Sequence, residues 1–231
     1  MPVKAKYFIG LTIAAGSLLI ADSLTLGANF ANLPVYVICF ALALLTSTLK
    51  VRLPGLTGTI SVNFLFILMS IAAFSSSETV LMAAVSCLVQ CLWNTKRRPK
   101  VLQVSFNAAS LALSSGLAYR ASHFIVGTQE GNLTVLLTLA SVLFFIANTL
   151  LISGVLALVE SKNLLQIWRQ CYLWTLPYYL VGATIAGMIV SSSQSMGWTK
   201  SLLILPLMYL VFVFYRTFVE RMGRTAPVTT S

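Results

Sequence analysis

The chain has 231 residues, of which 58% are hydrophobic and only 9% are charged. Soluble domains carry about 25% charged residues, so this composition excludes an ordinary soluble domain and favours a bundle of membrane-spanning helices. The formal net charge is +10, but the basic residues stand beside the ends of apolar runs, where anionic headgroups attract them; we therefore expect membrane lipids, and not nucleic acid, as partners.

About eight apolar runs follow one another, and most suit a membrane-spanning helix in length. The first helix is predicted over 7–25 and lacks a clear cleavage site, so we expect it to be retained. The second is predicted over 34–49, with Pro34 in its first turn. The glycines and prolines of 51–58 (VRLPGLTG) predict a tight cytoplasmic turn, and a third helix follows over 59–74.

The fourth helix begins with a capping signal. Ser75 and Glu78 have the spacing of a capping box, so this helix is expected to start here and to end at Trp93. A basic turn follows it. The fifth helix is predicted over 101–119 and the sixth over 133–159, with a polar outer loop between them.

The segment 162–172 differs from the others because polar and apolar residues alternate in it at helical spacing. This pattern predicts a short helix lying in the cytoplasmic interface, with Trp168 at headgroup depth. A seventh span is predicted over 173–190, followed by a serine-rich outer turn over 191–195. The last span is predicted over 201–215.

The fifteen Lys and Arg residues predict how the chain crosses the membrane. If both termini are cytoplasmic, thirteen of them lie inside and two outside, the bias expected because cationic loops resist translocation. We therefore expect an all-α polytopic bundle over 1–222 in a bacterial inner membrane, with a disordered cytoplasmic tail over 223–231. The basic residues expected to face lipid headgroups or a partner are Lys96, Arg97, Arg98, Lys100, Arg216, Arg221 and Arg224.

The titratable residues argue against catalysis. Enzyme mechanisms gather such groups in one place, but the chain offers one histidine and five acids, and no two acids lie three or four residues apart. Cys87 and Cys91 share a helix face without a second pair nearby, so two packing thiols are expected instead of a zinc site. We expect no enzymatic activity, no metal and no cofactor.

A polar stripe runs along the predicted fifth helix and is the first candidate site. Gln103, Asn107, Ser110 and Ser114 fall on one face, which must point into the protein because polar groups are costly in lipid. The stripe has two interpretations: hydrogen-bonded contact between helices, or one wall of a pocket for a small polar ligand. Its candidate partners are Asn63, Gln90 and Asn148.

A second candidate site lies at the outer ends of the first and fifth helices. Asp22, Arg120 and His123 are expected at similar depth, where they could form an extracytoplasmic recognition cluster. The alternative is that each side chain simply extends to water. Separately, the spacing of Gly182 and Ala186 predicts a face for close helix packing, within the chain or between protomers.

Several segments resemble a known family. The pieces STLKVRLPG, TGTISVNFLF, LVQCLW, KRRP and SFNAASLALSSGLAYR are similar to the N-terminal membrane region of bacterial HD-GYP and diguanylate cyclase signalling proteins. The segment LPLMYLVFVFYRTFVERM resembles the part that leads there into a cytoplasmic signalling helix. The resemblance covers most of the chain and is densest between 47 and 119.

The resemblance implies a membrane sensor module. Because the chain extends only about fifteen residues past its last predicted span, we expect no output domain in cis and no catalytic residue carried over from the family. The expected function is a non-enzymatic sensor or regulator acting on a separate cytoplasmic signalling enzyme, with self-association as a further expected partnership. The alternative is a small-solute transporter or the substrate-binding membrane subunit of a transport complex, since transporters also place polar groups near the bilayer midplane.

Topology can be tested with single cysteines in a background without native cysteines. Arg97→Cys and Gln129→Cys are expected to react with a membrane-impermeant thiol reagent from opposite sides of the membrane, because the first lies in a basic turn and the second in a predicted outer loop. Labelling in intact cells and in inverted vesicles makes the comparison. Reaction of both from the same side would contradict the predicted topology.

Overall fold

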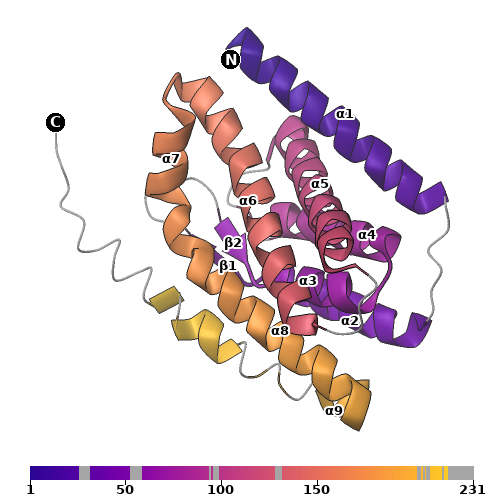
Figure 1. Ribbon diagram of the computed structural model, residues 1–231. Helices are drawn as coiled ribbons and strands as arrows, with labels where there is room; N and C mark the ends of the chain where they lie inside the picture. Colours follow the sequence, from indigo (N-terminus) through magenta and orange to yellow (C-terminus); the bar gives the residue numbers. More distant parts are fainter. Residues whose placement is uncertain are drawn as a thin grey trace.

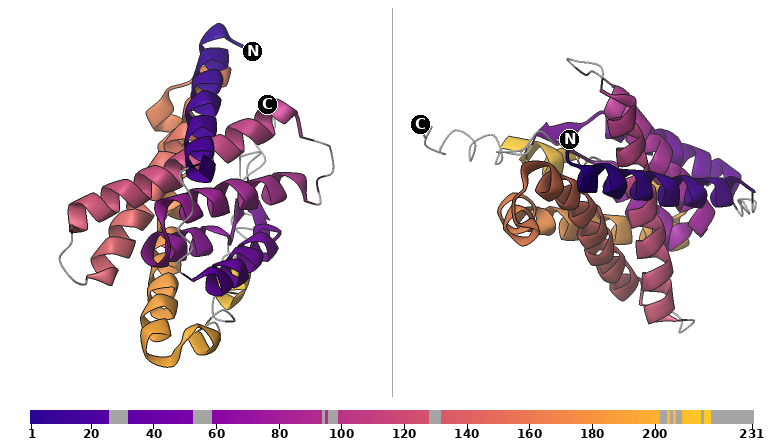
Figure 2. Two further views of the ribbon diagram at one scale, coloured as in Figure 1. Left: turned by 90° about the vertical axis from the view of Figure 1, so that its right-hand side faces the viewer. Right: turned by 90° about the horizontal axis from the view of Figure 1, so that it is seen from above.

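The computed structural model of the chain describes residues 1–25, 32–52, 59–93, 95, 99–127, 132–201, 204, 206, 209–214 and 216–217. Figures 1 and 2 show the described elements as a bundle of helices that cross one another. In chain order they are α1 (Val3–Thr25), α2 (Leu33–Ser47), β1 (Lys50–Arg52), β2 (Thr59–Ser61), α3 (Phe64–Ala73), α4 (Ser76–Leu92), α5 (Val101–Val126), α6 (Leu133–Glu160), α7 (Leu164–Cys171), the 3₁₀ turn η1 (Leu173–Thr175), α8 (Leu176–Met196) and α9 (Trp198–Ser201).

The helical, membrane-protein character of the chain is confirmed. Within the described ranges, α1, α5, α6 and α8 are long and apolar enough to cross a bilayer. The other apolar helices are shorter, with 15 residues in α2, 10 in α3 and 17 in α4. At 1.5 Å per residue, α3 is only about 15 Å long, half a bilayer core. The predicted total of eight spans and the cytoplasmic position of both termini stay predictions.

The shortest of these helices, α3, lies at the centre of the bundle (Figure 1). Every side chain from Phe64 to Ile71 is buried, and none is more than 3% exposed. Because α3 is apolar on all sides, it must be covered on all sides. It packs against α2, α4, α5, α6 and α8, so both of its ends lie within the fold.

The start of the predicted third helix is wrong. The sequence placed it at Thr59, whereas Thr59–Ser61 forms β2 and pairs antiparallel with β1, with Lys50 opposite Ser61 and Arg52 opposite Thr59. The β-branched residues Thr59 and Ile60 favour this extended backbone. The all-α class is confirmed, and one short two-stranded pair is added to it. Most of the predicted turn between the strands lies outside the described residues.

The predicted serine-rich turn over 191–195 is also wrong, because α8 continues to Met196. Ser193 donates a hydrogen bond to the carbonyl of Val190 at 2.6 Å, and Ser195 donates to Ser192. These serines therefore bond to the carbonyls of their own helix. The helix stops at Gly197, whose φ of 80° suits glycine.

The capping box predicted at the start of α4 is confirmed. The Glu78 backbone N–H donates to Ser75 Oγ at 3.3 Å, and the Ser75 backbone N–H donates to Glu78 Oε2 at 2.7 Å. Each side chain thus satisfies a backbone group that the first turn leaves without a partner. The break between α3 and α4 is fixed at this point.

The short helix predicted over 162–172 is found as α7. Its Trp168 is half-buried against the Phe145 ring and donates through Nε1 to Thr149 Oγ1 at 2.9 Å. The indole is therefore anchored on α6; its depth among lipid headgroups stays a prediction. Beyond α9, residues 209–214 and 216–217 are helical; the tail predicted over 223–231 lies outside the described residues.

Small residues allow two close contacts between helices. In Figure 2, α1 crosses α5, and the contact is made at Gly16, where an added Cβ would lie 2.5 Å from Ala109 Cβ. On α8, Gly182 lies under the Phe64 ring, which packs against Tyr178 and Tyr179 at centroid distances of 5.0 and 4.8 Å. The predicted packing face of α8 is thus used within the chain, on α3.

The close contact predicts unequal effects of the same substitution. Gly182→Ala is expected to destabilise the protein by about 1–3 kcal/mol, because a Cβ there meets the Phe64 ring in a packed core. Gly10→Ala on α1 is the control: nothing lies within 4 Å of its added Cβ, so the higher helix propensity of alanine is expected to be neutral or stabilising. Unfolding in mixed micelles measures both. Equal stabilities of the two variants would contradict this packing.

Candidate functional site: a polar network at the start of α3

Four polar side chains meet where β2 leads into α3. The Ser61 hydroxyl lies 2.5 Å from Asn63 Oδ1 and 3.0 Å from Gln90 Oε1, and Asn63 Nδ2 donates to Ser86 Oγ at 3.2 Å. Ser61, Asn63 and Ser86 are at most 4% exposed, whereas Gln90 is half-buried. We call these four residues the Asn63 network.

The network follows from the local fold. β2 brings Ser61 beside Asn63, which precedes the first turn of α3. Ser86 and Gln90 lie four residues apart on α4, so they share one helix face. The Ser61 hydroxyl has a single hydrogen and donates to one of its two acceptors at a time. This arrangement has two alternative hydrogen-bond patterns.

The N-terminal half of α5 lies on another side of α4. Asn107 is half-buried and its Nδ2 donates to Cys91 Sγ at 3.5 Å. Cys91 also accepts a hydrogen bond from Cys87, and both are free thiols, as predicted for packing cysteines. Asn107 therefore meets α4 and not Asn63. Gln90 and Asn107 are both half-buried: Gln90 belongs to the Asn63 network, and Asn107 contacts Cys91, the next residue along α4.

A basic residue stands near this edge. Lys50 Nζ donates to the Trp93 carbonyl at 2.7 Å, just past the C-terminal end of α4, where a cation is favoured by the helix dipole. Desolvation lowers the pKa of the Lys50 ammonium, and the nearby Cys91 opposes that shift. The contact joins β1 to α4 beside the network.

The predicted polar stripe is only partly internal. Gln103 is exposed, so the prediction that the whole stripe faces the interior is wrong; the first turn of α5, after the exposed Lys100, extends beyond the bundle. Ser114 is buried and donates to the Ser110 carbonyl at 2.7 Å. The Ser110 hydroxyl is 1% exposed and finds no partner within the described part of the chain. Ser114 thus fits the packing interpretation of the stripe.

Asn148 does not join the Asn63 network. It is half-buried on α6 and hydrogen-bonds Tyr179 of α8. Tyr179 in turn packs against Phe64, the first residue of α3, at a centroid distance of 4.8 Å. Tyr179 therefore links Asn148 to α3.

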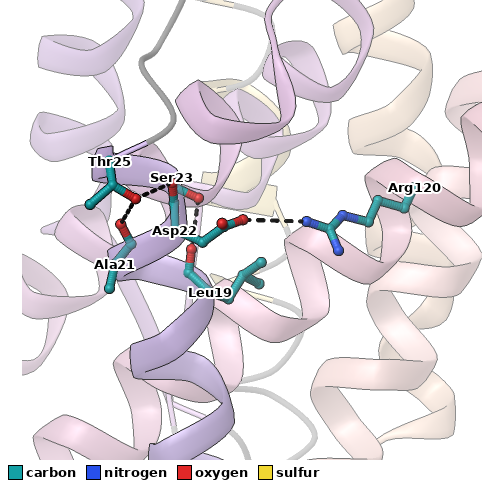
Figure 3. Close-up of polar contacts among 6 residues, drawn as sticks. All are labelled: Leu19, Ala21, Asp22, Ser23, Thr25 and Arg120. Carbon is teal, nitrogen blue, oxygen red and sulfur yellow. Dashed lines mark hydrogen bonds and ion pairs between the residues drawn. The ribbon is translucent and has the colours of Figure 1, made fainter.

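The predicted outer cluster is brought together in part, as Figure 3 shows for Asp22 and Arg120. Arg120 Nη2 lies 3.9 Å from Asp22 Oδ2, and the two side chains are 64% and 48% exposed. Such an exposed pair contributes about 0–1 kcal/mol. His123 faces another way: its Nε2 donates to the Ile71 carbonyl of α3 at 2.9 Å. Asp22 and Arg120 thus join α1 to α5, and His123 joins α5 to α3.

The predicted basic surface is described at two positions. Lys100 is exposed before α5, and Arg216 is exposed in the last helical segment. The others, Lys96, Arg97, Arg98, Arg221 and Arg224, lie outside the described residues.

Sequence reasoning missed Ser61, Ser86 and the burial of Glu78. The spacing of Ser86 and Gln90 on one face of an apolar helix was an available signal. Ser61 carried none, because a helix was expected where β2 forms. Glu78 was identified only as a capping residue, yet it is 2% exposed.

Comparison with known proteins gives no relative: no family profile, curated protein or solved structure matches this chain.

The network predicts an energetic coupling between α3 and α4. Asn63→Ala and Ser86→Ala are each expected to destabilise the protein by about 1–3 kcal/mol, since each leaves a buried polar partner unpaired. The double variant should lose less than the sum, by about 0.6 kcal/mol. Unfolding in mixed micelles measures the cycle. Thr138→Val is the control, because Thr138 is exposed and bonds only within its own helix; additive effects at Asn63 and Ser86 would disprove the coupling.

Proposed function

We propose that this chain is a non-enzymatic sensor or regulatory module of a bacterial inner membrane, with both termini in the cytoplasm. It binds a small polar ligand at the edge of the Asn63 network and acts through helix rearrangement on a separate cytoplasmic partner. The observation that carries the proposal is the hydrogen-bonded network itself, built where the chain changes from β2 to α3.

Irregular backbone within an apolar bundle supports a binding role. Non-helical segments at membrane depth are tolerated where protein buries them or where they line a cavity. Here β2 ends at Ser61. The side chains of Ser61 and Asn63 hydrogen-bond to each other, and Asn63 also hydrogen-bonds to α4. A network with two alternative bonding patterns can rearrange when a ligand replaces one partner. Gln90 and Asn107 are half-buried, so they are the groups a ligand would meet first.

A route for transmission runs through α3 to α8. At its start, Phe64 packs into α8 through Gly182, Tyr178 and Tyr179. Just past its other end, Phe74 stacks on Trp198, which follows α8, at a centroid distance of 6.1 Å. A shift of α3 therefore acts on both ends of α8. The ligand must bind one arrangement more tightly than the other for such a shift to occur.

The resemblance to membrane regions of HD-GYP and diguanylate cyclase proteins supports a signalling role. In those proteins the membrane region precedes the enzyme. The proposed readout here is the helical segment that includes Arg216, which carries an exposed charge where a cytoplasmic partner would dock.

A second function, small-solute transport, is favoured by one observation. Transporters place substrates at discontinuous helices inside the membrane, and α3 is a short, fully surrounded helix between two breaks. In this role the Asn63 network would be the substrate site, and α3 the element that moves.

The ligand site is tested by thermal-shift screening of small polar solutes against the purified protein. Asn107→Leu is expected to weaken a hit by at least about fivefold, the equivalent of roughly 1 kcal/mol for one lost hydrogen bond. Gln103→Leu is the matched control, since Gln103 is an exposed amide on the same helix, and it should leave affinity unchanged. Equal affinities of both variants would argue against a site beside Asn107.

Counterflow in proteoliposomes separates the two functions. A sensor is expected to bind the hit without moving it across the membrane, whereas a transporter exchanges labelled for unlabelled solute. Measurable exchange, abolished by Asn107→Leu, would replace the sensor proposal with the transporter.

A further inference from the structure

The buried carboxylate of Glu78 lies at the opposite end of α4 from the Asn63 network. Eight residues separate it from Ser86, about 12 Å along the helix. Glu78 is 2% exposed. Its Oε2 accepts the Ser75 backbone N–H at 2.7 Å, but its Oε1 is buried and has no hydrogen-bond partner among the described residues. The capping box thus explains one carboxylate oxygen and leaves the other without a role.

A buried carboxylate oxygen needs a donor or a cation, because desolvation without compensation costs several kcal/mol. Basic side chains near this end of the bundle have other partners or are exposed, as Lys200 of α9 is. Arg120 pairs with Asp22, and His123 donates to the Ile71 carbonyl. The ion pairs found in the described ranges are Arg120–Asp22 and Lys162–Glu160. Glu78 is in neither.

Phenol oxygens from two other helices lie near this end of α4. From α2, the Tyr36 hydroxyl donates to the Glu78 backbone carbonyl at 3.1 Å. From α5, the Tyr119 hydroxyl lies within electrostatic range of the Glu78 carboxylate, as does that of Tyr36.

The geometry points to a site for a small alkali cation at Glu78, with Oε1 as the charged ligand and the phenol oxygens of α2 and α5 near it. Carboxylate and phenol oxygens suit hard cations. A single carboxylate matches a single charge. The described residues hold no group of three or more His, Cys, Asp or Glu side chains, which disfavours a divalent or transition metal. The near-complete burial of Glu78 favours a small metal ion over a larger organic cation.

This inference does not rest on the proposed function, because it uses other residues at the other end of α4. A bound cation would instead have a structural effect on the bundle. Glu78 starts α4 directly after the break that ends α3, and Tyr36 and Tyr119 belong to α2 and α5. A cation held there would tie together α2, α4 and α5 beside this break.

Thermal unfolding of the full-length protein in nanodiscs tests the site. The midpoint is compared in NaCl, KCl and choline chloride at equal ionic strength. We expect Na⁺ or K⁺ to raise the midpoint above choline by at least about 2–4 °C. Glu78→Gln should lose that difference, since the amide oxygen keeps the capping acceptor but not the charge. Asp22→Asn, which removes an exposed acid, should keep it.

Two results would overturn the site: equal midpoints in the three salts for the wild-type protein, or an alkali-ion effect that survives in Glu78→Gln. If Glu78→Gln does not fold, line broadening of the sodium NMR signal by the wild-type protein decides the matter. Broadening that K⁺ reverses supports the site. The absence of broadening contradicts an alkali-ion site. Reversal by methylammonium at a lower concentration than by K⁺ also contradicts it and favours an amine.

Discussion

The structure depends on one constraint: a ten-residue helix has both ends inside an apolar bundle. Each end of any helix leaves four backbone groups without intrahelical partners, and water does not reach them when the helix is fully surrounded. At the start of α3, the backbone N–H groups of Leu65 and Phe66 donate to the carbonyls of Val62 and Asn63, while the Asn63 network joins the same point to α4. At its end, His123 donates to the Ile71 carbonyl, and Ser75 and Glu78 cap the next helix. The two candidate sites thus lie beside the two ends of one short helix.

Aromatic packing converts that central helix into a link between the two halves of the chain. Phe64 fills the space over Gly182, and its contacts with Tyr178 and Tyr179 reach Asn148 on α6. A rigid ring over a glycine leaves little freedom for α3 to move alone. Displacement of the helix must therefore move α8, or break these contacts.

Much of the fold could be predicted from local sequence signals. The apolar runs predicted the helices, and the capping box at Ser75 and Glu78 fixed the start of α4, because capping depends only on residues close in the chain. Gly127 and Gly197, with φ of 66° and 80°, end α5 and α8; the sequence placed these ends too early, since serines and aromatic residues after 119 and 190 are tolerated in helices. The strand β2 was missed because its partner β1 lies across a turn, and no local pattern distinguished it from a helix.

The sites were harder to predict, since burial depends on residues far apart in the chain. Asp22 and Arg120 were correctly predicted to lie close together. His123 instead hydrogen-bonds to the Ile71 carbonyl, a partner 52 residues away that no local pattern indicates. Gln103 and Asn107 share one helix face, yet one is exposed and the other half-buried, because α5 extends beyond its neighbours. Periodicity predicts which face of a helix is buried. It does not predict where along the helix the neighbouring helices stop burying that face.

The contacts of α1 have a consequence for biosynthesis. Its buried residues, Ala5, Ile9, Thr12, Gly16 and Ser23, form a narrow stripe, and α1 packs against α4, α5 and α6, all of which are made after it. Ribosomes add about 5–20 residues per second, so on the order of 10 s separate the completion of α1 from that of α5. During that interval the nascent helix has to reside in lipid with its small side chains uncovered, and the insertion machinery or the lipid must hold it until α5 emerges.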